Sequence, residues 1–196
     1  MVNSAQLVEQ VALSLGQPVT STRQHARNLR EASLITHGGR GRHAPAMTRE
    51  DAAALLCVVL GSDAVYDTLK TIESLNGLTA NSPRRWFAPA SEARPVRQIA
   101  LALLPGHGLV AGLSEVLRLF DAEQEYVERW RFETGLEKEI YVVLEIQYPQ
   151  HFASLTVGVR DFFSETWTYG RRHQARTEQI RRCRQAALRE ISACLR

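Results

Sequence analysis

Histidine and cysteine come first among the residues that could do chemistry, because they are common metal ligands and nucleophiles. The histidines lie at positions 25, 37, 43, 107, 151 and 173, and no two of them form an HxxxH or HExxH pattern. No cysteine or carboxylate stands at metal-ligand spacing from them. Cys57, Cys183 and Cys194 form no CxxC pair and have apolar neighbours, which is typical of reduced core thiols. We therefore expect no metal and no cofactor.

Motifs for covalent or acid–base catalysis are also missing from the sequence. Cys57 lies within LLCVV, where burial would keep its thiol protonated and inert. Gly106 and Gly108 are spaced like part of a phosphate-binding loop, but no GxGxxG motif or Walker lysine completes it. No GxSxG or SxxK motif is present, and we interpret the glutamates at 137, 139 and 145 as solvated carboxylates. These patterns indicate a protein that is not an enzyme.

Arginine is abundant and unevenly placed. The formal net charge is +3, and 22 of the 24 basic residues are arginine. Residues 1–49 carry a charge of +4, residues 50–98 carry −1, residues 99–170 carry −6 and residues 171–196 carry +6. A basic head and a basic tail around an acidic middle favour two surfaces that meet polyanions, of which nucleic acid is the obvious one.

Length and composition set the class of protein. With 196 residues, the chain suits one large or two small domains and can bury its own core. Hydrophobic residues make up 44% and charged residues 23%, values that exclude disordered and disulfide-scaffold proteins. The longest apolar runs are far shorter than the roughly 20 residues that span a bilayer. The first ten residues lack a signal-peptide pattern, so we expect a soluble, cytoplasmic protein without membrane contact.

The N-terminal elements are predicted from helical periodicity and turn residues. Ser4 can cap a first helix that Gly16 ends, and Thr20 or Ser21 can cap a second helix that runs to about Ala32. The stretch 34–47 predicts a hairpin with a flexible, glycine-rich and basic tip. A third helix follows from Thr48, which forms a capping pattern with the acidic residue at 51, and a fourth covers about 64–75.

The order helix, short turn, helix, Leu-Ile, glycine-rich hairpin and helix resembles the winged helix-turn-helix domains of bacterial and phage DNA-binding proteins. The residues that carry this resemblance are Leu-Val at 7–8, Leu-Gly at 15–16, HARNLREASLI at 25–35 and GGRGR at 38–42. It covers roughly the first 60 residues. The resemblance implies that the second helix lies in the major groove, while the hairpin wing touches phosphate or the minor groove.

The residues that would contact DNA follow from the physical fit of a helix to the major groove. Outward residues near the start of the second helix would reach base edges, and arginines would reach phosphates or guanine. The glycines of the wing would let its arginines approach the backbone or a narrow minor groove. The predicted DNA-binding residues are Thr20, Ser21, Thr22, Arg23, Gln24, His25, Arg27, Asn28, Arg30, Arg40 and Arg42.

The C-terminal half predicts a different architecture. Prolines at 83, 89 and 95 indicate a linker over 78–98, which would divide a DNA-binding domain at 1–77 from a second domain at 99–196. A helical segment begins at about Leu109, and alternating residues in 140–147, 153–159 and 162–169 predict an antiparallel β meander. From Arg172 onward, three- and four-residue steps predict a terminal amphipathic helix. The expected fold class is α+β, mainly helical.

These features favour a sequence-specific DNA-binding protein, a bacterial or phage transcriptional regulator whose residues 99–196 dimerise, bind a protein partner or sense a ligand. The expected partners are double-stranded DNA and a second copy, with a dimer favoured over larger oligomers. Two alternatives stay open at this point. One is a phage DNA-packaging component similar to small terminase subunits. The other is a protein-interaction adaptor in which the acidic block from 99 to 170 is the functional face.

Overall fold

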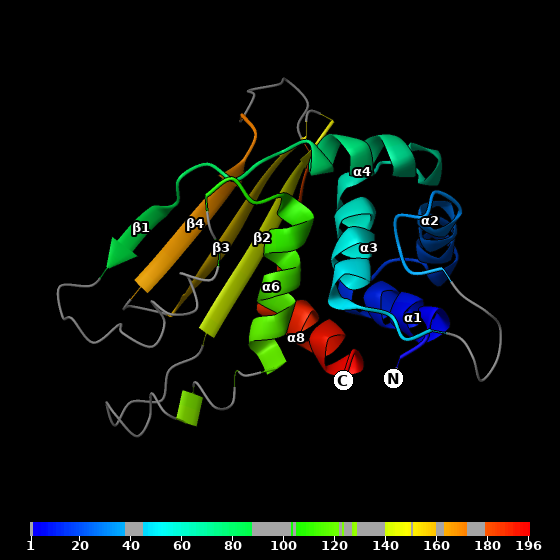
Figure 1. Cartoon of the computed structure of the whole chain (residues 1–196), viewed down its shortest axis with the longest axis horizontal. Coiled ribbons are helices and arrows are strands. Elements are labelled where there is room, and N and C mark those ends of the chain that lie inside the picture. The colour runs from blue at the N-terminus through cyan, green and yellow to red at the C-terminus, as the bar shows by residue number, and fades with distance from the viewer. Residues whose placement is uncertain are drawn as a thin grey trace.

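The computed structural model of the chain describes residues 2–37, 45–87, 103, 105–121, 123, 127–128, 140–149, 151–159, 163–171 and 179–196. It confirms the predicted α+β class: helices lie on one face of a five-stranded antiparallel sheet (Figure 1). The elements are α1 Ser4–Leu15, α2 Val19–Glu31, α3 Arg49–Gly61, the short 3-10 helix η2 Val65–Asp67, α4 Thr68–Asn76, β1 Arg84–Phe87, α6 Leu109–Asp121, β2 Ile140–Tyr148, β3 Phe152–Val159, β4 Phe163–Tyr169, β5 Gln179–Arg184 and α8 Gln185–Cys194.

The first two helices are set by the residues at their ends. The side chain of Asn3 accepts a hydrogen bond from the backbone N–H of Gln6, and the Gln6 side chain accepts one from Asn3, so α1 starts one residue before its prediction. Gly16 ends α1 in the left-handed region, with φ 62°, which glycine adopts without steric cost. After Pro18, α2 begins at Val19, and no side chain caps it.

Helix α3 is the buried centre of the helical layer. Thr48 Oγ1 accepts from the backbone N–H of Asp51 at 3.2 Å, and the Asp51 carboxylate accepts from that of Thr48 at 2.7 Å, which confirms the predicted capping pattern. Every residue from Asp51 to Gly61 is buried. Because α3 contacts α1, α2, α4, α6 and the sheet, apolar residues are required on all its sides.

The predicted β meander is confirmed and is the middle of a larger sheet. Strands β2, β3 and β4 pair in sequence, β1 adds to β4, and β5 adds to β2, giving the order β1-β4-β3-β2-β5. Along β2, alternate residues such as Val142 and Leu144 are buried beneath the helices, whereas Tyr141 and Val143 point to the opposite face. The sheet therefore has one covered face and one face on which the described part of the chain places no helix.

The predicted terminal helix is wrong over residues 179–184, which form β5; α8 begins only at Gln185. The spacing of Ile180 and Cys183 fits a helix and hides a two-residue alternation, in which Cys183 faces the core and Ile180 faces outward. The backbone of this segment pairs with the edge of β2, a long-range partner that local periodicity cannot reveal. The predicted residues before 179 lie outside the described ranges.

The flanks of the predicted wing are not strands. Among the described residues, neither 34–37 nor 45–48 has strand structure, so the expected hairpin is not observed there. Thr36 instead donates from its backbone N–H and its hydroxyl to the Asp51 carboxylate, both at 2.7 Å, which fixes this segment to the start of α3. The tip that contains Arg40 and Arg42 lies outside the described residues.

The hydrophobic core runs across the predicted domain limit at residue 77. Buried apolar residues of α1, α3, α6, the sheet and α8 form one cluster, and α1 packs along α8. Ser14 Oγ donates to the Glu190 carboxylate at 2.6 Å, and Arg49 pairs with Asp121. Within the predicted linker, Arg84–Phe87 forms β1. No helix in the described ranges is long and apolar enough to span a bilayer.

Candidate nucleic-acid interface

Helix α2 stands at the edge of the molecule, on the side away from the sheet (Figure 1). Only three residues separate it from α1, and its inner side packs against α1, α3 and α4. A pair of helices joined by such a short turn is the unit that DNA-binding helix-turn-helix proteins use to present their second helix. The exposed side of α2 is therefore the candidate surface for contact with DNA.

Four of the predicted DNA-binding residues share that exposed side. Thr20, Arg23, Gln24 and Arg27 are all exposed, and their spacing of three, four and seven residues places them on one face of the helix. No described residue pairs with the guanidinium of Arg23. Arg27 Nε donates to Glu31 at 2.7 Å, an exposed pair that raises the pKa of Arg27. Because exposed pairs are weak, Arg27 can exchange this carboxylate for a phosphate.

Two predicted base-contacting residues face the protein interior, so their expected outward placement is wrong. Thr22 is fully buried and its hydroxyl donates to the carbonyl of Pro18 at 3.2 Å. His25 is 6% exposed, and its Nδ1 lies 2.7 Å from Thr68 Oγ1. Burial, helped by the charge of Arg181, lowers the pKa of His25 to about 4, so the ring is neutral at pH 7. Both side chains hold α2 against its neighbours.

The remaining predicted residues of α2 are half-buried at its border. Asn28 Nδ2 donates to the carbonyl of Val65 at 2.8 Å and to Thr68 Oγ1 at 3.2 Å, while its carbonyl oxygen accepts from Gln24. The guanidinium of Arg30 donates to Ser4 Oγ, and Ser21 is half-buried at the first turn. Asn28 is thus a positioning residue that fixes α2 to η2 and α4. No local pattern around Asn28 could point to Thr68, since it lies 40 residues away.

Several arginines in the described part of the basic tail are paired within the protein itself. Arg181 donates to the carbonyl of Ser62 at the end of α3, and Arg182 Nε donates to Glu145 at 2.7 Å. Arg189 forms a two-contact pair with Glu123, at 2.5 and 2.7 Å. These arginines tie β5 and α8 to acidic partners elsewhere in the fold. The charge of +6 in the sequence of residues 171–196 therefore does not describe one open cationic surface.

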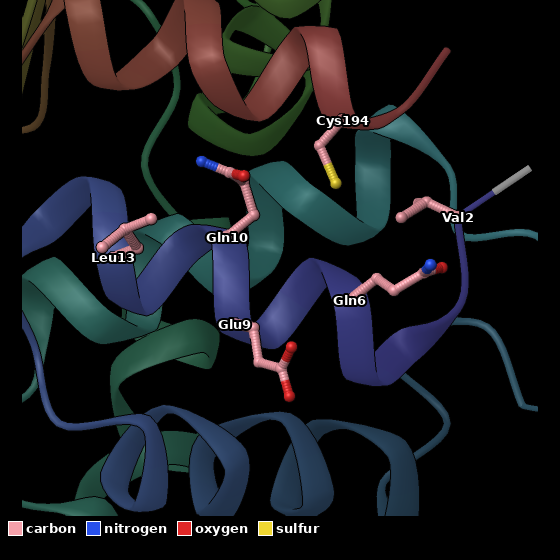
Figure 2. Close-up of a pocket in the computed structure, with 6 residues that line it drawn as sticks. All are labelled: Val2, Gln6, Glu9, Gln10, Leu13 and Cys194. Carbon is pink, nitrogen blue, oxygen red and sulfur yellow. The ribbon is translucent and has the colours of Figure 1, made fainter.

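A second surface feature is a groove between α1 and α8. It has a volume of about 460 Å³ and is lined by Val2, Gln6, Glu9, Gln10, Leu13 and Cys194. Figure 2 shows Gln10 and Cys194 between the two helices, whereas Glu9 points away from α8. The described residues that line it include no cation and no pair suited to catalysis. Burial raises the pKa of the Cys194 thiol, which disfavours the thiolate.

The core thiols have no catalytic setting in the described ranges. Cys57 and Cys183 are buried, and burial raises the pKa of each to about 12, so both remain protonated and unreactive at pH 7. In the same part of the chain, no three histidine, cysteine or acidic residues gather where a metal ion could bind.

Comparison with protein-family models, with curated proteins and with solved structures finds no match to this chain.

Proposed function

We propose that the protein binds double-stranded DNA sequence-specifically through the exposed face of α2 and acts as a transcriptional regulator. The observation that carries this proposal is the single row of Thr20, Arg23, Gln24 and Arg27 on a helix held out by a three-residue turn. Hydroxyl, amide and guanidinium groups are the ones that read base edges and phosphates in the major groove. No basic patch of comparable arrangement on one helix is found elsewhere among the described residues.

Each residue of the row has a distinct task in this proposal. Gln24 is the base reader, since its amide offers one donor and one acceptor to adenine. Arg23 and Arg27 contact phosphates or guanine. Thr20 lies in the first turn of α2, where backbone N–H groups without a side-chain cap favour a phosphate oxygen. The buried His25 and the bound Asn28 keep these groups in register.

Selection of bound duplexes from a random library tests sequence specificity. We expect one enriched motif for the wild type. The Gln24→Ala variant should relax the preference at one or two positions, because a bidentate contact discriminates between bases by about 1–3 kcal/mol. The Arg23→Gln variant should weaken binding to all duplexes while it keeps the motif. The matched control is Arg171→Gln, an exposed arginine beyond β4, which should leave both unchanged. A library without any enriched motif contradicts the proposal.

The oligomeric state decides how the helix is used. A two-fold dimer would place two copies of α2 about one turn of DNA apart, so the enriched motif would be a palindrome. A ring of eight or more subunits would favour the packaging alternative, and binding of a protein but no DNA would favour the adaptor. Light scattering of the protein with and without the selected duplex separates these outcomes.

A further inference from the structure

A second pocket borders the face of the sheet on which the described part of the chain places no helix, called the open face below. Its volume is about 600 Å³ and it is lined by Trp86, Tyr141, Val142, Val143, Arg184, Gln185 and Ala186. These residues come from β1, β2, β5 and the start of α8, so the pocket is built by segments far apart in the sequence. No residue of α2 lines this pocket, and α2 lies on the far side of α3 from the sheet (Figure 1).

The register of the sheet places the two aromatic residues of the pocket, Trp86 and Tyr141, in one row. One row across the open face reads Trp86, Ser164, Gly158 and Tyr141, with small residues between two aromatic ones. A Cβ atom at Gly158 would lie 2.8 Å from Tyr141 Cζ and closer still to the carbonyl oxygen of Phe163. The tyrosine ring therefore lies over Gly158. Trp86 is 53% exposed, which leaves a large part of its ring available.

The neighbouring row supplies positive charge at both ends. It reads Arg84, Thr166, Thr156, Val143 and Arg184, and the two central hydroxyl groups hydrogen-bond to each other at 3.0 Å. Neither of these arginines forms an ion pair with a described residue. The only carboxylate on the described part of this face, Glu145, is already held by Arg182. The part of the open face that borders the pocket therefore carries the positive charge of Arg184, whereas the charges of Glu145 and Arg182 balance each other.

From these rows we propose that the pocket binds a nucleotide, with the base stacked on Trp86 and Tyr141 and the phosphate held by Arg184. Exposed aromatic rings on a sheet provide stacking surfaces for bases, and a guanidinium matches the geometry of phosphate. The start of α8, at Gln185 and Ala186, borders the same space. Nucleotide binding in this pocket does not require DNA binding by α2.

Calorimetric titration of the full chain with AMP, with adenosine and with single-stranded (dA)8 tests the proposal. We expect AMP to bind more tightly than adenosine, since only AMP carries the phosphate. The Trp86→Leu variant should weaken AMP binding on the order of tenfold, the usual size of one lost stack. The Arg184→Gln variant should reduce the difference between AMP and adenosine to near zero.

Three controls keep the result specific to this pocket. Tyr66→Leu removes an aromatic residue that is 83% exposed and lies outside the pocket, and it should leave AMP binding unchanged. Arg182→Gln removes the neighbouring, already paired arginine of β5 and should have little effect. Arg23→Gln should weaken duplex DNA binding without changing AMP binding, so failure of this proposal and failure of the proposed function can be told apart. Thermal melting verifies that each variant is folded.

The ligands also distinguish the source of the nucleotide. Equal affinity for AMP and (dA)8 identifies a free nucleotide as the ligand, and affinity for (dA)8 at least about tenfold higher identifies a single strand. Both results support the pocket. Absence of binding by AMP and by (dA)8 up to about 1 mM, or wild-type affinity in both Trp86→Leu and Arg184→Gln, overturns it.

Discussion

Single residues of α2 divide into those that hold the helix and those that it presents to solvent. Thr22, His25 and Asn28 use their polar atoms inside the protein, on Pro18, Thr68 and Val65. A buried polar group must find such a partner, because leaving it unpaired costs about 1–3 kcal/mol. The exposed row of α2 can therefore change its contacts without weakening the packing of the helix. A surface that binds DNA needs such freedom, while the residues beneath it hold the helix in place.

Acid should lower the free energy of unfolding through the buried His25. Its pKa is about 4 in the folded protein and about 6.5 in an unfolded chain, so only the unfolded chain takes up a proton between these values. Stability is then full above pH 6.5 and falls as the pH is lowered towards 4, by up to about 3 kcal/mol. We expect His25→Gln to lose this part of the pH dependence in urea unfolding.

Gln24→Ala, which removes an exposed side chain without an ionisable group from the same helix, provides the control for this experiment. It should leave the slope of stability against pH between 4.5 and 7 as in the wild type. An unchanged slope in His25→Gln would show that the histidine is protonated in the folded state, and the burial argument for α2 would then be wrong.

A buried carboxylate on the covered face of the sheet, that of Glu165, should make the protein depend on the arginine that pairs with it. Glu165 is fully buried; Arg85 Nε donates to one of its oxygens at 2.7 Å, and the other oxygen has no hydrogen-bond partner among the described residues. Burial raises the pKa of Glu165, and Arg85 partly offsets that rise. Arg85→Ala should destabilise the protein by about 3 kcal/mol at pH 7, because the charge is left unpaired.

Adding Glu165→Gln to Arg85→Ala should restore most of that stability, since no buried charge remains. The loss in Arg85→Ala should also shrink as the pH falls, because protonation then neutralises a carboxyl group whose pKa is raised in the folded state. Arg84→Ala, on the open face, should change the free energy of unfolding by less than about 0.5 kcal/mol. Equal losses in the two single variants would contradict the ion-pair account.

At the scale of elements, caps and strong alternation were predictable, whereas long-range pairing was not. Gly16, Thr48 and the alternating residues of β2 carry their signal in adjacent positions, and the structure confirms them. Strands β1 and β5 exist because the edges of β4 and β2 accept them. Their own residues, RRWF and QIRRCR, hold no pattern strong enough to overrule a linker or a helix.

The starts of α3 and α2 should differ in how much stability they lose when a threonine is replaced by alanine. Thr48→Ala removes a cap that satisfies a backbone N–H of α3, and we expect a loss of about 1 kcal/mol in denaturant unfolding. Thr20→Ala is the matched change in α2, where Thr20 is not the cap, and it should change stability by less than about 0.5 kcal/mol. A loss for Thr20→Ala as large as for Thr48→Ala would mean that α2 begins at the position first expected.

The candidate site was predictable to the same extent as its elements. Helical periodicity located α2 and gave Thr20, Arg23, Gln24 and Arg27 their shared outer face. Periodicity could not show that Thr68 would hydrogen-bond to His25, or Val65 to Asn28. Only the tertiary fold places η2 and α4 beside α2. The pocket at Trp86 and Tyr141 was missed for the same reason, since it depends on the strand order.

For the whole molecule, the continuous core implies one cooperative unit. Helix α3 is buried by α6 and the sheet as well as by the N-terminal helices, and α1 packs on α8. A fragment of residues 1–77 would expose these apolar surfaces to water and should lack stable tertiary structure. We expect its circular dichroism to show a weak, broad thermal transition, whereas the full chain should unfold in a single sharp transition. A fragment that melts as sharply as the full chain would indicate a separate domain.

The most direct test of DNA binding through α2 is the affinity for a duplex measured across a salt series. Each phosphate contact contributes about −0.9 to the slope of log K against log salt. DNA binding through α2 should give a steep negative slope for the wild type, a slope shallower by about 1 for Arg23→Gln, and an unchanged slope for Arg171→Gln. Absence of duplex binding at low salt, or the same slope in Arg23→Gln as in the wild type, would contradict it.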